Sequence, residues 1–279
     1  MMDLGQFEEP LLLFGGPYSN LQATQALHME TDRLGIPPER VICNGDIVAY
    51  CAQPEETVDF VRDWGIHVVA GNYKTSLAAG SPDCGCGFEA GTACALLSDN
   101  WYPFANAAIS DENRNWMQGL PHAIRFGLNS FKFHVIHGTP SAINRFVFAS
   151  TPRQEKQAEL ETARTDVIIG GHCGIPFGER LGNGYWLNTG VIGMPANDAT
   201  REGWYLLIAG ERHGIRASWH RLGYDNQQAY SAMTEAGMNN GYADALQSGL
   251  WPSMDVLPES ERTLRGKPIS LDDMILERD

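Results

Sequence analysis

Two short apolar runs in the first quarter of the chain stop abruptly at a small residue that precedes a side-chain oxygen ligand. Residues 41–45 end at Asp46, and residues 66–71 end at Asn72. Such runs predict buried strands, and in a sheet with parallel strands the polar residues follow the carboxyl ends of those strands. We therefore expect Asp46 and Asn72 to lie close together at one edge of a sheet.

Two later apolar runs have the same form but end in imidazole. Residues 131–136 stop at His137, and residues 166–171 stop at His172. Taken singly, each of the four polar residues has an ordinary role in a turn or loop. Together, four strand ends would deliver two oxygen and two nitrogen ligands to one edge of a sheet. That set suits one divalent transition metal ion such as Zn, Mn, Fe or Ni.

The first 70 residues alternate between strand and helix patterns. A strand at 11–14 precedes a helix capped by Ser19 or Asn20, and a strand at 40–43 precedes a helix that begins at Pro54. A third strand follows, and this βαβαβ order indicates parallel strands covered by helices.

The second half of the chain has several strand patterns with few long helices between the last ones, so we expect antiparallel pairing there. These strands are predicted at 131–137, 166–170, 185–188, 203–209 and 214–220. The predicted fold class is α/β, with two mixed β-sheets packed face to face and flanked by helices.

The order of the short motifs resembles that of the calcineurin-like metallophosphoesterase superfamily, and within it the bacterial branch of small phosphodiesterase-like proteins. The resemblance covers roughly residues 11–209. It rests on Gly45-Asp46, Gly71-Asn72-Tyr73, His137-Gly138, Gly171-His172 and Asn188-Thr189-Gly190. It implies an αββα sandwich that hydrolyses phosphate esters at a metal centre.

The departures from the family pattern all affect one of its two metals. The family has Asp-x-His after the first strand, where this chain has Gly16-Pro17-Tyr18, and Gly-His-x-His where this chain has Gly171-His172-Cys173-Gly174. Carried over residue by residue, the resemblance leaves Asp46 alone at the first metal. The second metal keeps every protein ligand, namely Asp46, Asn72, His137 and His172. We therefore expect a single ion.

Tyr73 and Lys74 are the candidate catalytic residues. Tyr73 stands where the resemblance implies a histidine general acid, and a phenol with a pKa near 10 suits proton transfer at neutral pH only if its environment shifts that pKa. Its alternative role is an aromatic wall of the pocket. Lys74 is either a solvated surface residue or, if it points inward, a replacement for the absent second cation against a phosphate.

A substrate pocket is expected beside the metal. Tyr18 there would either donate a hydrogen bond to a substrate oxygen or fill the volume of a lost ligand. The residues expected to form the pocket are Gly16, Tyr18, Cys173, Gly174 and Asn188.

Two functions from different classes fit these observations. The first is a metal-dependent phosphoesterase-like hydrolase with one ion and weak activity on generic phosphate esters. The second is a catalytically inert protein that binds a metal or a phosphorylated ligand on the same scaffold. Both predict a bound metal and a small phosphorylated ligand, and turnover separates them.

The net charge of −14 disfavours nucleic acid as a partner, because it repels the phosphate backbone. No apolar run has the roughly 18 residues of a membrane span, so no membrane partner is expected. The start of the chain lacks a basic segment followed by an apolar stretch, which predicts a cytoplasmic protein.

Two segments are set apart by composition. Residues 74–120 form an insertion in a domain spanning 1–223, and we expect its part up to Cys94 to lie at the mouth of the site. Cys84 and Cys86 are expected to be free thiols, with a zinc site that includes Cys94 as the alternative. Residues 224–279 are expected to be a C-terminal extension, not an independent domain, that packs either on the domain itself or on a second subunit in a homo-oligomer.

Overall fold

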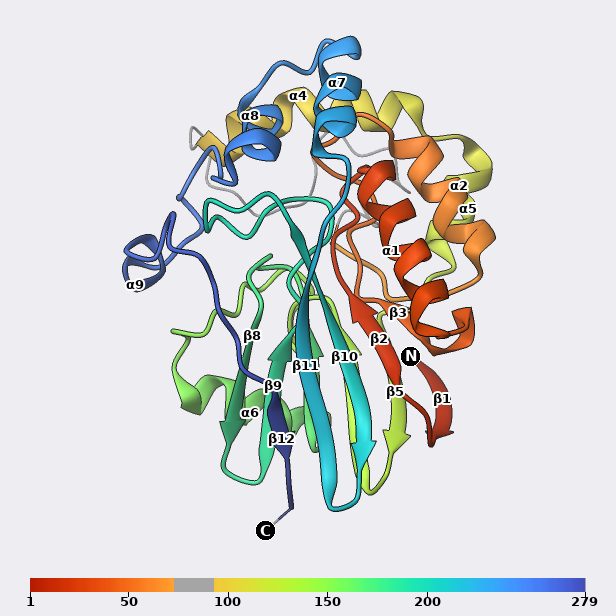
Figure 1. Ribbon diagram of the computed structural model, residues 1–279, viewed down its shortest axis with the longest axis vertical. Coiled ribbons are helices and arrows are strands. Elements are labelled where there is room, and N and C mark those ends of the chain that lie inside the picture. The colour runs from red at the N-terminus through yellow and green to blue at the C-terminus, as the bar shows by residue number, and fades with distance from the viewer. Residues whose placement is uncertain (73–92, 279) are drawn as a thin grey trace.

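Two six-stranded sheets lie face to face in the computed structural model, which describes residues 1–72 and 93–278 (Figure 1). Sheet 1 has, in spatial order, β1 (Met2–Phe7), β5 (Ala123–Leu128), β6 (Phe131–Ile136), β7 (Val167–Gly170), β9 (Gly184–Asn188) and β8 (Phe177–Leu181). Sheet 2 has β12 (Met274–Leu276), β11 (Gly214–Leu222), β10 (Gly203–Glu211), β2 (Leu11–Phe14), β3 (Val41–Cys43) and β4 (His67–Val68).

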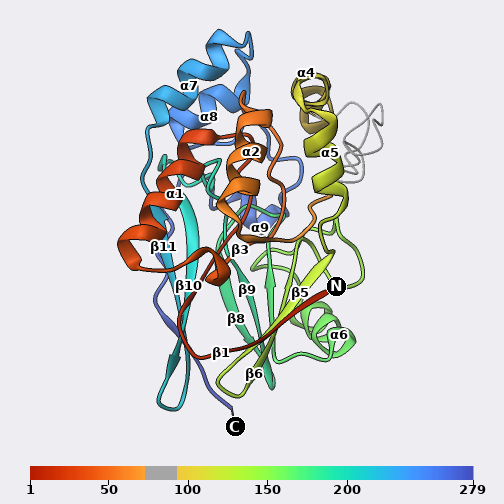
Figure 2. The ribbon, with the colours of Figure 1, turned by 90° about the vertical axis from the view of Figure 1, so that its right-hand side faces the viewer.

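Helices cover both outer faces of the sandwich, and Figure 2 shows α1 and α6 on opposite sides of the two sheets. Sheet 1 is covered by α6 (Arg153–Ala163). The helices on the side of sheet 2 are α1 (Leu21–Leu34), α2 (Pro54–Trp64), α4 (Ala93–Ala108), α5 (Asp111–Gln118), α7 (Asn226–Glu235) and α8 (Gly241–Ser248). The described residues also include two short pieces, the 3₁₀ turn η1 (Pro38–Arg40) and α9 (Glu259–Arg262). The predicted αββα architecture is confirmed.

The four apolar residues of β2 explain why this strand has no polar face. Leu11 and Leu13 belong to the core between the two sheets, whereas Leu12 and Phe14 belong to the core between sheet 2 and its helices. Successive side chains of a strand point to opposite faces, so a strand covered on both faces needs an unbroken apolar run.

The predicted starts of the first two helices are confirmed. Asn20, one of the two residues proposed as the cap, accepts a hydrogen bond from the backbone N–H of Ala23 at 3.0 Å. Gly35 ends α1 in the left-handed conformation, and Pro54 occupies the first turn of α2. Ser110 caps α5 through the N–H of Asn113. Local chemistry sets these boundaries.

The antiparallel pairing expected in the second half is only partly correct. β10 and β11 pair antiparallel, but β6 with β7 and β7 with β9 pair parallel. The reason lies in the connections: α6 crosses from the end of β6 back to the start of β7, and β8 provides the return before β9. The strands β1, β5, β8 and β12 were not predicted.

The C-terminal extension packs onto the body of the molecule. α7 lies against α1, and β12 joins the edge of sheet 2 beside β11. Tyr185 of β9 bonds through its hydroxyl to both the N–H and the carbonyl of Glu277. Within residues 1–72 and 93–278, no helix is long and apolar enough to cross a membrane.

Candidate metal centre

The four predicted ligands come from two sheets, which corrects the expectation of a single sheet edge. Asp46 and Asn72 follow β3 and β4 of sheet 2, whereas His137 and His172 follow β6 and β7 of sheet 1. Because β3, β4, β6 and β7 all end at the same end of the sandwich, the loops that follow them meet there. The structure brings all four side chains together.

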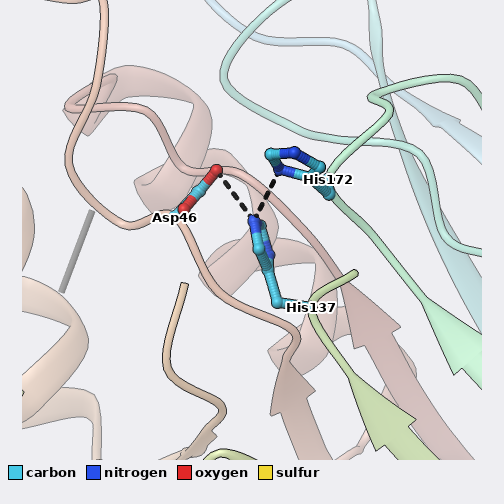
Figure 3. Close-up of side chains that lie close together, drawn as sticks. All are labelled: Asp46, His137 and His172. Atoms are coloured by element: carbon cyan, nitrogen blue, oxygen red, sulfur yellow. Dashed lines mark hydrogen bonds and ion pairs between the residues drawn. The ribbon is translucent and has the colours of Figure 1, made fainter. Parts of the chain in front are cut away.

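His137 lies at the centre of the cluster (Figure 3). Its Nε2 is 3.1 Å from Asp46 Oδ2, 3.0 Å from Asn72 Oδ1 and 2.9 Å from His172 Nδ1. Around an ion with bonds of about 2.1 Å, neighbouring ligands at right angles lie about 3.0 Å apart. The separations in this cluster therefore match those of adjacent ligands around one ion.

The tautomer of His137 leaves the cluster without enough protons. Its Nδ1 is 3.0 Å from the carbonyl of Asn44, and since a carbonyl only accepts, the Nδ1 proton is donated there. In a neutral ring, Nε2 can accept a hydrogen bond only from His172 Nδ1, and the oxygens of Asp46 and Asn72 then face it without a proton between them. In a protonated ring, one N–H faces three acceptors. Asp46 Oδ1 is buried with no hydrogen-bond partner within the described residues. A divalent cation can pair with all of these lone pairs at once, whereas a single proton cannot.

Burial keeps the second imidazole neutral. His172 is 8% exposed, and desolvation lowers its pKa well below the ordinary value, with His137 adding to the effect. Phe146 stacks on the His172 ring with centroids 4.1 Å apart, which fixes the orientation of that ring. A neutral, oriented imidazole is the form that ligates metals.

Two of these residues have strained backbones. Asp46 and His172 both have positive φ values, 54° and 60°. Gly71 lies so close to Asp46 that a Cβ there would collide with the carboxylate. Left-handed conformations of non-glycine residues cost free energy and concentrate at functional sites, where the surrounding structure holds them.

The model of the calcineurin-like phosphoesterase superfamily domain matches residues 20–210, more than half of the chain. This protein belongs to that superfamily. A curated relative, the uncharacterized protein MJ0912 of Methanocaldococcus jannaschii, is 26% identical over 236 residues, which cover 78% of this chain and 89% of the relative.

Two solved structures have a similar fold. The metallophosphoesterase from Sphaerobacter thermophilus has a TM-score of 0.68 at 18% identity and covers 88% of this chain and 100% of its own. The hypothetical protein PH1004 from Pyrococcus horikoshii OT3 has a TM-score of 0.72 at 13% identity, covering 86% and 98%. At these identities the similarity concerns the fold.

Asn44 is a residue of the candidate metal centre that the motif analysis missed. Its side-chain amide donates to the carbonyl of Gly170 at 2.8 Å and to Thr189 Oγ1 at 2.9 Å, which ties the end of β3 to the ends of β7 and β9. Its own carbonyl orients His137. The available signal was a polar residue directly after a fully buried strand, next to Gly45-Asp46.

Three of the expected pocket residues line a cavity beside His172, namely Tyr18, Cys173 and Gly174. Gly16 and Asn188 are not on its wall. Asn188 is fully buried; its amide donates to the carbonyl of Gly171 and its oxygen accepts from the N–H of Gly190. It thereby holds the loop that carries His172.

Several predicted residues lie outside the described part of the chain. These are Tyr73, Lys74, Cys84 and Cys86, together with the predicted position of residues 74–92 at the mouth of the site and the side chain of Cys94. The roles assigned to them from the sequence stay predictions.

Proposed function

We propose that this superfamily member is a phosphoesterase that works with one divalent transition-metal ion. The observation that carries the proposal is the convergence of Asp46, Asn72 and His172 on His137 Nε2 with too few protons between them. These four residues would hold the ion. When bound, it supplies polarisation of a phosphoryl oxygen and a lowered pKa for water.

Steric features at two glycines support a single ion. Gly16 and Gly174 occupy positions where the superfamily pattern has metal ligands. A Cβ on Gly16 would lie 2.6 Å from Tyr18 Cζ, and one on Gly174 would lie 3.2 Å from Trp251 Cζ2. Both glycines have positive φ, 45° and 72°. Aromatic rings thus fill the volumes that the side chains of the missing ligands would need.

Tyr18 contributes a neutral phenol near the centre. Burial raises its pKa well above the ordinary value, and the charge of Asp46 acts in the same direction. The hydroxyl therefore stays protonated across the physiological range and is suited to donate to a phosphate oxygen, while its ring packs against Gly16. The two roles considered for Tyr18 from the sequence are compatible.

Activity on generic phosphate esters should be weak. A single-ion site lacks the symmetric clamp of two metals, and losing one preorganised stabiliser of developing charge costs about 3–4 kcal/mol, or about 10²–10³ in rate. Lys74 follows Asn72 by two positions, and we propose that its ammonium offsets part of this loss. Tyr73 is proposed to line the same site.

The first test is metal content. Chain loaded with Zn²⁺ or Mn²⁺ and freed of excess ion should hold one equivalent by elemental analysis, and His137→Ala should hold none. His134→Ala is the matched control, since His134 lies on β6, the strand that leads to His137, but bonds to Arg125, and this variant should keep its ion. Two equivalents in the wild type would contradict the single-ion site.

The second test is turnover of a panel of small phosphodiesters by the loaded protein. We expect slow, metal-dependent hydrolysis that is abolished in Asp46→Ala. Lys74→Ala should lose activity and phosphate affinity but keep its metal. A loaded wild type that binds phosphate without any turnover would favour the inert binding protein.

A further inference from the structure

A cavity of about 70 Å³ lies beside His172, and the C-terminal extension forms much of its wall. Water needs about 10–15 Å³ of such volume, so the cavity has room for roughly five to seven heavy atoms. The wall is mostly apolar and aromatic. The lining residues that matter here are Tyr50, Phe146, His172, Tyr242, Trp251 and Val256.

The aromatic walls are held in fixed orientations. Tyr50 and Tyr242 stack with centroids 4.2 Å apart and an interplanar angle of 21°. Tyr18 packs against Tyr50 at 4.7 Å. In the C-terminal extension, Trp251 donates its indole N–H to the carbonyl of Pro195 at 2.7 Å. A preformed pocket of this kind binds a flat group without the entropic cost of ordering its walls.

The lack of charged side chains among the described lining residues restricts which groups the cavity can bind. None of its described lining residues is Asp, Glu, Lys or Arg. A charged group placed there would lose its hydration without gaining a partner. The cavity also borders His172, one of the four residues of the centre, so a group bound in it lies next to a phosphate at that centre.

We propose that the cavity receives an uncharged, phenyl-sized aromatic group of a phosphate ester whose phosphate binds at the metal centre. This inference rests on the proposed function and names its substrate class. A purine fits less well, because its fused double ring exceeds the volume of the cavity. The C-terminal extension thus acts as a specificity element.

The test compares phenylphosphonate with methylphosphonate, which share the phosphorus group and resist hydrolysis. Binding to protein loaded with Mn²⁺ is measured by isothermal titration calorimetry. We expect the wild type to bind phenylphosphonate at least about tenfold more tightly than methylphosphonate. Trp251→Ala, which removes a wall, and Val256→Phe, which fills the cavity, should both bring this ratio close to one while methylphosphonate affinity stays within about twofold.

Trp116→Ala is the matched control. Trp116 of α5 is partly buried like Trp251 but does not line the cavity, so the ratio should stay at the wild-type value. Equal affinities in the wild type, or a ratio preserved in both cavity variants, would overturn the inference. A wild type that takes up metal without preferring the ring overturns this inference alone. One that takes up no metal overturns the proposed function as well.

Discussion

Asn44 joins the two halves of the candidate site although it belongs to no ligand set. It is 1% exposed and touches three separate strand ends, through its amide to Gly170 and Thr189 and through its carbonyl to His137. Residues that orient metal ligands influence metal affinity strongly. The fold therefore depends on this side chain for the relative position of the ligands from the two sheets.

Replacing Asn44 by Ala should weaken both stability and metal binding. The buried partners of its amide would lose their donor, which costs about 1–3 kcal/mol of unfolding free energy. Metal affinity should fall about 10–100-fold. Urea unfolding and metal titration measure the two effects. Asn129→Ala is the control, because the Asn129 amide also donates two hydrogen bonds, to the carbonyls of Glu211 and Gly214, but far from the site. It should lose stability alone, and an equal loss of affinity would contradict the role of Asn44.

His134 should make the protein less stable in mild acid. Burial, with the charge of Arg125, lowers the pKa of His134 from 6.5 to about 4, and its Nδ1 accepts from Arg125 at 3.2 Å. The unfolded chain therefore binds more protons between these values, so stability is full above the unfolded pKa and falls as the pH drops toward 4. Between pH 8 and pH 5 the loss amounts to about 2 kcal/mol.

Urea unfolding at the two pH values checks this in wild type and His134→Gln. The variant should lack that part of the decline, because Gln does not titrate. The same pH dependence in both proteins would show that other groups cause it.

At the scale of elements, the sequence predicted those features that a short segment determines by itself. Asn20 and Pro54 mark helix starts, and the four apolar runs with polar ends located the candidate ligands. The pairing of the strands was harder to predict, because β1 and β12 join their sheets through partners more than 50 residues away. The role of Trp251 could not be predicted either, since its contact with Gly174 exists only after the extension folds back.

A substitution at Gly174, which lies in the turn between β7 and β8, tests the contact between Gly174 and Trp251. Gly174→Ala should cost about 1–2 kcal/mol for the left-handed backbone, plus a further penalty from the indole of Trp251. In the Trp251→Ala background only the backbone cost should remain. The control is Gly182→Ala, where φ is 51° and a Cβ would meet only Gln157 Oε1, at 3.5 Å. Its cost should not depend on Trp251, and additive effects of Gly174→Ala and Trp251→Ala in urea unfolding would rule out the steric coupling.

The whole molecule is stabilised by its last 55 residues or so. Met233 of α7, Leu246 of α8 and Leu276 of β12 are fully buried, the first two over sheet 2 and the third between the sheets. Removing them would expose apolar surface of the remaining chain and leave β11 as a bare edge strand. The extension is therefore part of the core in energetic terms.

A chain ending at Gly223 should consequently fail to show a cooperative thermal transition above about 25 °C. A chain ending at Pro268, which lacks β12 but keeps α7 and α8, should unfold cooperatively at a reduced temperature. Circular dichroism on heating compares both with the full chain. A 1–223 chain that melts at the temperature of the full protein would show that the extension is dispensable.

The contact of Trp251 with Gly174 also implies an order of folding events during synthesis of the chain. A ribosome makes residues 224–276 after every strand of the two sheets except β12 has been synthesised, and domains generally begin to fold as they emerge. Until Trp251 docks, the cavity beside His172 lacks part of its wall, and until β12 docks the edge of β11 has no partner. The nascent chain can therefore bring its four candidate ligands together before the proposed ring pocket exists, and that pocket is completed only when residues 224–276 dock.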